Sequence, residues 1–392
     1  MRLFLILLLS ATIASAALFN LKDFGKELGD LLDLDKFEGL FKGNKIQDFI
    51  GKLKNVTENT KGALKLASSL HGKIDSSAKK DFNNFFQYII KFSKKYKDNS
   101  TITERFQKFR NSLKRVDALQ KTSKLAKFGV TKFSDLSPEE FKEKYTGIRD
   151  VEDVEQLHST ASPATPIRAK RDTPASFDWR EKNGVTSVKS QKDCGCCYAF
   201  SAIGAIESQF KIKTGKEVDL SEQQAVSCTY KQKRYDNNQG CDGGSARGVL
   251  AYAINHGLTT ESEWKYTSGD DKKIPPCVAK PTSVKMSKQE RVPRGDEGKM
   301  AEYVSSVGPI VTYIDSTQIM DYVSGIVDAP KPAKGWAVDH GVLTVGYGEE
   351  NGTPYWIIKN SWGEDWGEQG YVRVVRGKNS LQLADFNFAV YA

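Results

Sequence analysis

Histidine and cysteine are scarce in this chain of 392 residues. It has four histidines and six cysteines, and every cysteine falls between positions 194 and 277. A zinc site is disfavoured because His256 is the only histidine near these cysteines and no paired C-x-x-C spacing recurs downstream. A redox motif is disfavoured too, because the C-x-x-C from Cys194 to Cys197 follows no thioredoxin-like strand pattern. We therefore expect neither a metal nor a cofactor.

Long apolar runs and a uniform charge are also lacking. After the first dozen residues no stretch is apolar enough to span a membrane. The net charge of +9 is uneven, because residues 1–171 carry +11 and residues 172–392 carry −2. Nucleic-acid binding would require basic residues interleaved with aromatics on the folded domain. We expect no nucleic-acid partner.

The N-terminus has the pattern of an export signal. Arg2 precedes an apolar core from Leu3 to Leu9, and small residues at Ala14-Ser15-Ala16 form a cleavage site. We expect residues 1–16 to be removed and the chain to enter the secretory pathway, where disulfides persist. Weak glycosylation signals that fit this route occur at Asn55, Asn99 and Asn351.

The next two segments have helical apolar patterns. Residues 17–80 form a lysine-rich extension whose role is unknown; a packing appendage is favoured over a partner-binding or membrane-surface helix. Residues 81–148 are expected to form a small helical domain, with a capping box at Ser137 and Glu140. Two of its helices should pack as a hairpin through apolar faces made of Phe82, Phe85, Phe86, Ile89 and Phe92, and of Phe106, Phe109, Leu113 and Val116.

Residues 149–171 lose this periodicity and are rich in Ser, Thr, Ala and Pro, which is typical of an exposed linker. The basic cluster at 168–171 has a plain alternative as a solvated charge run. Because the composition changes abruptly on either side, we favour a processing site. Cutting after Arg171 would release residues 172–392 as a separate domain.

The stretch QKDCGCCYAFS, residues 191–201, carries the first chemical signal. Apolar residues continue from it at helical spacing until Gly215, which predicts a helix with one apolar face that begins at Cys197. Exposed backbone amides at a helix N-terminus favour the thiolate, the nucleophilic form of cysteine. Cys196 and Cys197 are adjacent and cannot easily pair with each other, whereas the other four cysteines are far enough apart to form bridges.

The second signal lies far downstream, at His340 and Asn360. His340 opens an alternating run, DHGVLTVGYG, and Asn360 follows in PYWIIKNSWG. A lone histidine on a strand is more often structural than catalytic. A thiol nucleophile nevertheless needs a base, and the base needs an orienting group, so Cys197, His340 and Asn360 form a minimal set for acyl transfer.

These motifs together resemble the papain family of cysteine proteases, of the cathepsin L-like type. The resemblance runs through FDWR, QKDCGCCYAF, LSEQQAVSC, GCDGG, DHGVLTVGYG and KNSWGEDWGEQGY, and residues 82–141 resemble the family's helical inhibitory prosegment. It implies an α+β fold of two lobes, one helical with Cys197 and one β-barrel-like with His340 and Asn360. An N-terminal helical inhibitory prodomain would precede the lobes, so the chain would be a zymogen.

The resemblance also implies roles for single residues. Gln191 and the backbone N–H of Cys197 would stabilise the oxyanion, Asn360 would orient His340, and Trp362 would shield that contact. Gly243 and Gly244 would present backbone to an extended substrate. The main side-chain pocket would be lined by Ala246, Val338 and an unusual Tyr313, which would make it shallow or aromatic, above a floor at Asp385 or Phe386. The implied disulfides are Cys194 with Cys241 and Cys228 with Cys277.

The expected partners are protein or peptide substrates, the chain's own prosegment and cystatin-type inhibitors, in a lysosomal or extracellular location. The opposite charges of prosegment and domain predict electrostatic docking that acid weakens by protonating carboxylates. A different hypothesis makes the chain a catalytically impaired pseudoprotease that binds proteins. It rests on Cys196 beside the nucleophile and on Tyr198 where the family has tryptophan.

Overall fold

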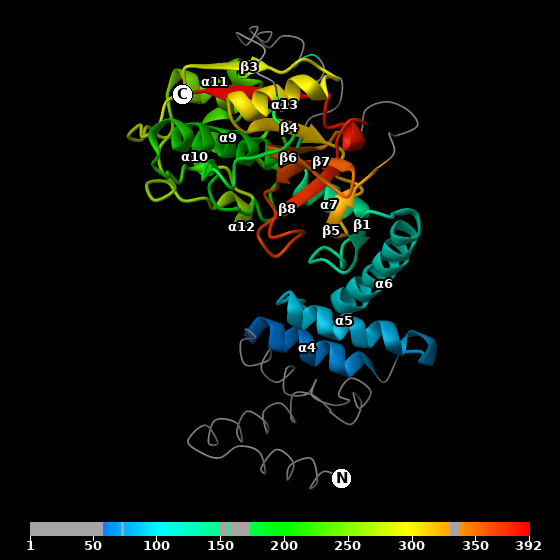
Figure 1. The fold of residues 1–392 in the computed structure, drawn as a ribbon. Coiled ribbons are helices and arrows are strands. Elements are labelled where there is room, and N and C mark those ends of the chain that lie inside the picture. Colours follow the sequence, from blue (N-terminus) through cyan, green and yellow to red (C-terminus); the bar gives the residue numbers. More distant parts are fainter. Residues whose placement is uncertain (1–57, 72–73, 149–155, 157–172, 330–337) are drawn as a thin grey trace, which may run out of the picture. The chain divides into compact units, whose positions relative to one another are not determined.

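The computed structural model describes residues 58–71, 74–148, 156, 173–329 and 338–392. The chain divides into two compact units, which we call unit 1 (Met1–Asn111) and unit 2 (Ser112–Ala392) (Figure 1). The expected signal peptide, Asn55 and Arg171 lie outside the described residues. Among the helices that are described, none combines the length and apolar character needed to cross a membrane.

Unit 1 is helical and has an aromatic core. Helix α5 (Lys79–Lys91) and the first half of α6 (Asn99–Thr122) form the predicted hairpin, in which the rings of Phe82 and Phe106 meet edge to face at 5.0 Å. The short η2 (Ser76–Ala78) precedes α5. A further helix, α4 (Glu58–His71), packs on α5 and buries Leu64 completely. The described part of the N-terminal extension is therefore a packing element.

Unit 2 begins with the second half of α6, which is followed by β1 (Ala126–Phe128) and α7 (Pro138–Tyr145). The capping box predicted at the start of α7 is confirmed. The backbone N–H of Glu140 donates to Ser137 Oγ at 3.2 Å, and the N–H of Ser137 donates to the Glu140 carboxylate at 3.0 Å. This reciprocal pair satisfies two amides that an uncapped helix would leave open.

The helical lobe of unit 2 is built around α9 (Cys197–Thr214), which ends at Gly215 in the left-handed conformation, as predicted. The prediction that this helix has a single apolar face was wrong. Helices α10 (Glu222–Thr229) and α11 (Ala246–Asn255), with strands β4 and β6, pack around α9, so most of its residues are buried. The lobe also holds η3 (Lys233–Tyr235), η4 (Gly240–Asp242) and α12 (Ser268–Asp271).

Two disulfides staple the helical lobe, and they are the two pairs that the resemblance implies. Cys194 bonds to Cys241 near the start of α9, and Cys228 bonds to Cys277 at the end of α10. Cys196 and Cys197 stay free and buried. The first bridge fixes the loop that leads into α9 against the η4 turn.

The other lobe is a mostly antiparallel sheet in the order β1-β5-β8-β7-β6-β4-β9-β3, and β2 pairs with β6. Among the strand pairs of the described residues, β5 with β8 is the parallel one. The sheet is not closed within the described residues. Helix α13 (Glu297–Ser306) packs on it, and η5 (Ser380–Gln382) precedes β9. The strands are β2 (Phe177–Asp178), β3 (Lys288–Arg291), β4 (Ile310–Ile314), β5 (Tyr322–Val327), β6 (His340–Glu350), β7 (Thr353–Lys359), β8 (Tyr371–Val375) and β9 (Asn387–Tyr391).

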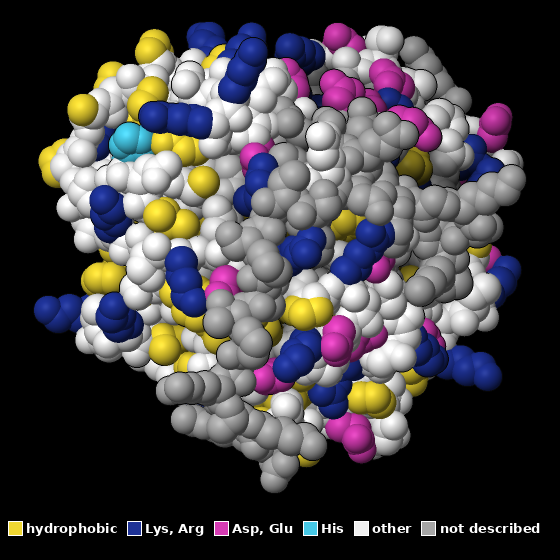
Figure 2. Space-filling model, turned by 90° about the horizontal axis from the view of Figure 1, so that it is seen from above, with side chains coloured by type: hydrophobic (Ala, Val, Ile, Leu, Met, Phe, Trp, Pro, Cys, Tyr) yellow, Lys and Arg dark blue, Asp and Glu magenta, His cyan; other side chains and the backbone are white. Residues whose placement is uncertain are grey.

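This arrangement is the predicted α+β architecture, with a helical lobe beside a sheet lobe and N-terminal prosegment helices (Figure 1). Each lobe has its own buried apolar cluster. On the face seen in Figure 2, Lys and Arg side chains are dispersed and interspersed with Asp and Glu. That face presents no single basic patch.

Candidate active site

Cys197 is the first residue of α9, and its side chain is completely buried. Its sulfur accepts a hydrogen bond from the backbone N–H of Gly341 at 3.2 Å. Gly341 follows His340 at the start of β6, and β6 packs directly on α9. The contact between helix and strand therefore joins Cys197 to Gly341, 144 positions away in the sequence, and so brings Cys197 to the neighbour of His340.

His340 and Asn360 are joined by a hydrogen bond of 2.7 Å between the ring Nε2 and the amide Oδ1. The antiparallel pairing of β6 with β7 brings them together, because Asn360 follows the last residue of β7. An amide oxygen can only accept, so Nε2 carries the hydrogen and Nδ1 of the neutral ring is the basic nitrogen. Nδ1 is buried and has no hydrogen-bond partner among the described residues.

Trp362 covers this pair. Its indole stacks on the His340 ring with centroids 4.6 Å apart and planes 28° from parallel, and only 1% of the tryptophan is exposed. Asn360 Oδ1 also accepts from the backbone N–H of Ser361 at 2.8 Å. The imidazole is thus fixed on one edge and shielded on one face.

Gln191 is fully buried and held at both ends of its side-chain amide. Nε2 donates to the carbonyl of Cys194 at 2.9 Å, and Oε1 accepts from the Ser361 hydroxyl at 2.8 Å. Its backbone N–H donates to the Ser361 carbonyl at 2.9 Å. Because Nε2 has two hydrogens, one remains to meet a developing negative charge.

The protonation states differ from the prediction for Cys197. Burial raises the pKa of the Cys197 thiol above its ordinary value and outweighs the hydrogen bond from the Gly341 N–H. Burial also lowers the pKa of His340 to about 4 against the opposing Asn360 hydrogen bond. Burial also raises the pKa of the neighbouring Asp339 to about 6. The structure therefore holds thiol and imidazole as a neutral pair.

The burial has an identifiable cause in residues 145–148, which lie across the site. The indole N–H of Trp362 donates to the carbonyl of Tyr145 at 3.1 Å. The backbone amides of Gly147 and Ile148 both donate to the carbonyl of Asp339, at 2.9 and 3.0 Å. A side chain at position 147 would overlap the backbone of Gly195, so this approach requires glycine.

Further contacts within unit 2 hold the part of the chain that leads into residues 145–148. Phe133 and Phe141 meet the Trp362 ring edge to face, at 5.3 and 5.1 Å. Arg115 donates two hydrogen bonds to the buried carboxylate of Asp321, at 2.5 and 3.1 Å. Aromatic packing and a charged pair thus anchor residues 115–141 at separate points.

The expected substrate-binding residues meet around the N-terminus of α11. Gly243, with φ of 105°, precedes Gly244, whose N–H donates to the carbonyl of Gly147 at 2.8 Å. The hydroxyl of Tyr313 accepts from the N–H of Ala246 at 2.8 Å, so the tyrosine spans from β4 to the start of α11. Ile148 packs against the cluster that contains Tyr313, Ala246, Val338 and Phe386.

Phe386 lies next to Tyr313, because the Tyr313 backbone N–H donates to the Phe386 carbonyl at 3.0 Å, and its side chain is fully buried. The Asp385 carboxylate instead accepts from the Asn379 side chain at 3.1 Å. Sequence reasoning also missed two polar partners. Ser361 was identifiable from its position between Asn360 and Trp362, whereas Tyr266, described below, had no local signal. Among the described residues no cluster of His, Cys, Asp and Glu could hold a metal.

Two protein-family profiles and several known proteases match this chain. The profile described as "Papain family cysteine protease" matches residues 173–391, and the profile "Cathepsin propeptide inhibitor domain (I29)" matches residues 85–141. Cysteine proteinase 1 of Dictyostelium discoideum is 35% identical over 320 residues, which cover 78% of this chain and 91% of that protein. A viral cathepsin of Choristoneura fumiferana nuclear polyhedrosis virus is 37% identical over 304 residues, covering 77% and 89%.

The solved structures that resemble the chain include digestive procathepsin L2 from the larval midgut of Tenebrio molitor. The TM-score is 0.71 at 30% sequence identity, and the match covers 80% of this chain and all of that chain.

Proposed function

The chain belongs to the papain family of cysteine proteases and is a hydrolase with an inhibitory propeptide domain; from this premise we propose that residues 172–392 form an endopeptidase with Cys197 as nucleophile. The hydrogen-bonded pair of His340 and Asn360 beside Cys197 carries the proposal. It supplies a base with a free nitrogen and a group that fixes its tautomer.

Once the covering segment leaves, the Cys197 thiol gives its proton to Nδ1 of His340, and the thiolate attacks the peptide carbonyl. The oxyanion is met by the remaining N–H of Gln191 Nε2 and by the backbone N–H of Cys197, which has no partner within the helix because it lies at the first turn. Each such donor is worth about 3 kcal/mol. The imidazolium then protonates the leaving amine, and an acyl-enzyme remains.

In the second half of the cycle, water attacks the acyl carbonyl while His340 takes one of its protons. The same oxyanion donors stabilise the second tetrahedral intermediate. Its collapse breaks the C–S bond, and the proton on His340 returns to Cys197, so the product acid leaves and the enzyme is regenerated. Trp362 keeps water from the hydrogen bond between His340 and Asn360 throughout.

The maturation route is part of the proposal. Residues 1–16 would direct the chain into the secretory pathway, residues 81–148 would keep it latent, and cutting after Arg171 in the linker 149–171 would release the enzyme. We also propose that the chain is delivered to the lysosome or the extracellular space, that it is glycosylated and that cystatin-type proteins inhibit it.

We further propose that Tyr313 makes the pocket beside Gly244 shallow, so that small or branched aliphatic side chains fit and aromatic ones do not. The buried position of Tyr313 supports this, because its hydroxyl accepts from the N–H of Ala246 at the start of α11 and its ring is only 2% exposed. Tyr313→Ala should raise kcat/KM for a phenylalanine peptide relative to a valine peptide by about tenfold or more, from the apolar area that it opens. Tyr313→Phe is the matched control and should keep the original preference.

The central test uses the released domain and internally quenched peptides. We expect cleavage within the peptide and stoichiometric labelling by a thiol-directed epoxide, with both lost in Cys197→Ser. Peptide binding without cleavage or labelling in the unmutated domain would instead favour the pseudoprotease hypothesis.

A further inference from the structure

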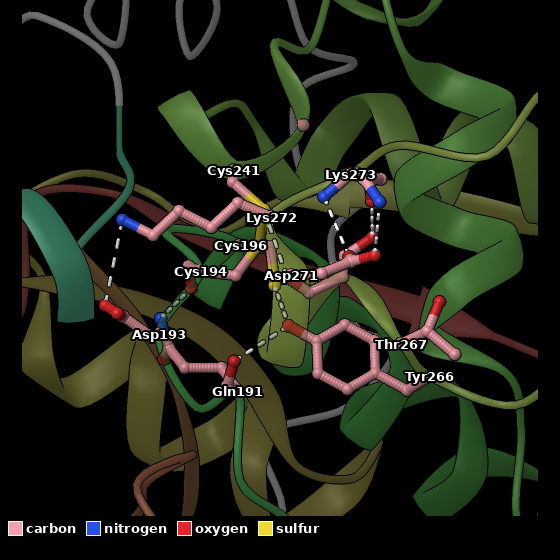
Figure 3. Close-up of a disulfide and its surroundings, with 12 residues drawn as sticks. Gln191, Asp193, Cys194, Cys196, Cys241, Tyr266, Thr267, Asp271, Lys272 and Lys273 are labelled. Carbon is pink, nitrogen blue, oxygen red and sulfur yellow. Dashed lines mark hydrogen bonds and ion pairs between the residues drawn. A yellow bond between two sulfur atoms is a disulfide. The ribbon is translucent and has the colours of Figure 1, made fainter.

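Cys196, the residue before the nucleophile, is fully buried and hydrogen-bonded to Tyr266 (Figure 3). Its sulfur lies 3.1 Å from the tyrosine hydroxyl, and that hydroxyl lies 2.8 Å from the backbone carbonyl of Gln191. A carbonyl can only accept, so the phenol donates to Gln191 and its oxygen accepts from the thiol. The chain of donors therefore runs from Cys196 S–H through Tyr266 O–H to the carbonyl of Gln191.

The surroundings leave this chain little freedom. A Cβ at Gly269 would lie 2.7 Å from the Tyr266 ring and 2.9 Å from the Gln191 carbonyl oxygen. Lys192 has φ of 52°, a left-handed conformation that costs a side-chain-bearing residue free energy, and its amine pairs with Asp270 at 2.7 and 2.9 Å. The segment from Tyr266 to Asp270 thus braces the backbone immediately at and after Gln191.

The helix that carries the nucleophile takes part in the same brace. The Tyr266 ring meets Phe200 of α9 edge to face at 5.1 Å. Burial raises the pKa of Cys196 to about 12 and raises the pKa of Tyr266 as well. Both groups therefore keep their protons at any physiological pH, and the donor chain persists.

We propose that Tyr266 and Cys196 are positioning residues for the oxyanion donor: they hold the backbone of Gln191 so that the free N–H of its side chain points at the reacting carbonyl. Neither residue needs to touch substrate. The inference rests on the proposed role of Gln191. It also gives Cys196 a function that differs from the disturbance of Cys197 on which the pseudoprotease hypothesis depends.

The alternative is that Cys196 and Tyr266 only fill space, since a free cysteine commonly packs as a small apolar residue. The two readings differ in what they require of the hydroxyl and the thiol hydrogen. Packing alone would tolerate Tyr266→Phe and would treat Cys196→Ala and Cys196→Ser alike. Positioning requires the Tyr266 hydroxyl and allows serine, which can also donate, to replace the thiol.

The test compares two reactions of the released domain, with active sites counted by the epoxide label. In Tyr266→Phe the hydroxyl's hydrogen bonds to Gln191 and Cys196 are both lost. We expect kcat for peptide hydrolysis to fall about fivefold to tenfold, which corresponds to the bond that holds the Gln191 carbonyl, with KM nearly unchanged. Alkylation of Cys197 by iodoacetamide forms no oxyanion and should keep its rate. Tyr322→Phe, which removes a phenol donor to the Gly325 carbonyl in β5, is the matched control and should change neither rate.

The Cys196 variants complete the design. We expect Cys196→Ala to lower kcat in the same direction and Cys196→Ser to restore most of it. Equal losses of hydrolysis and alkylation in Tyr266→Phe, or no loss of either, would overturn the positioning role. Gln191→Ala keeps this failure distinct from failure of the proposed function, because it should cost about 100-fold in kcat if Gln191 is the oxyanion donor.

Discussion

Gly147 shows how one residue type can decide whether the site is covered. Its backbone lies against Gly195 on one side and Gly244 on the other, and all three residues lack the side chain that would separate these backbones. The hydrogen bonds from Gly147 and Ile148 to Asp339 exist only because the chain can approach this closely. Glycine here serves close approach of two backbones.

Gly147→Ala should therefore open the unprocessed chain. The added Cβ would overlap the backbone of Gly195, which cannot move aside as a flexible side chain could. We expect the purified full-length variant to react with the epoxide label about 5 to 150 times faster than the unmutated zymogen, since the loss of two hydrogen bonds corresponds to about 1 to 3 kcal/mol.

Gly352→Ala is an informative comparison, because nothing lies within 4 Å of the added Cβ there, although its φ of 76° adds strain of its own. It should leave labelling of the zymogen slow. If Gly147→Ala stays as slow, the covering segment does not depend on this approach.

The identity of the candidate catalytic residues could be predicted from the sequence, whereas their protonation states could not. Cys197, His340 and Asn360 stood out because nucleophile, base and orienting group are a small set of residue types in recognisable motifs. The raised pKa of Cys197 depends on burial from every direction, including cover by residues 145–148. No local pattern around a cysteine encodes cover that comes from a segment about 50 positions earlier.

Helix α4 adds to the buried core of unit 1. Its alanines and Leu64 face α5, and the helix lies before the span matched by the propeptide profile, which begins at residue 85. Two aromatic-rich helices alone form a thin layer with two open faces. An added amphipathic helix covers one of them and extends the core of unit 1.

Two substitutions in α4 should change the stability of unit 1 in opposite directions. Leu64→Ala removes a fully buried side chain and should cost about 2 to 5 kcal/mol. Gly62→Ala, in a helix interior with nothing within 4 Å of the new Cβ, should add about 1 kcal/mol. Hydrogen exchange of the α5 amides in an inactive Cys197→Ser chain would measure both.

All six tryptophans lie at or after position 179, so fluorescence would report mainly on the other unit and serves as an internal control. Unchanged exchange in Leu64→Ala would show that α4 contributes nothing to the stability of α5.

Elements were predictable to different degrees for physical reasons. The end of α9 and the capping box of α7 depend on local residues. A glycine ends α9, and a Ser-x-x-Glu pattern forms the capping box of α7. The sheet order, and the pairing of prosegment strand β1 with β5, depend on contacts between segments about 200 residues apart. The burial of most of α9 has the same origin, because strands β4, β6 and β9 of the other lobe pack on it.

At the scale of the molecule, acid has opposing effects on the covered form of the site. Burial raises the pKa of Asp339, so a carboxyl that the covering segment helps to bury binds a proton more readily, and acid favours closing through it. The pairing of Arg115 with Asp321 acts in the expected direction, because the guanidinium opposes the rise that burial causes in the pKa of that carboxyl. His340 acts in the direction opposite to Asp339, because burial lowers its pKa.

Two of these effects nearly cancel. Burial lowers the pKa of His340 from its ordinary 6.5 to about 4, so if opening restores the ordinary value, covering loses about 3 kcal/mol as pH falls through that window. Burial raises the pKa of Asp339 from its ordinary 3.8 to about 6, so on the same premise covering gains a similar amount as pH falls from 6 to 3.8. The unmutated chain should show little net response from this pair.

Separate removal of each group should therefore produce opposite responses to acid. In an inactive Cys197→Ser chain, which has no thiolate and cannot process itself, Asp339→Asn leaves only His340, and opening should increase up to about 100-fold between pH 6.5 and 4. His340→Gln leaves Asp339, and opening should decrease over the same range. Exchange of the Gly147 and Ile148 amides, corrected for the intrinsic effect of pH, measures opening directly because both bond to Asp339 only in the covered form. Parallel pH slopes in the two variants would contradict this account, since the burial of a base and of an acid must shift proton binding in opposite directions.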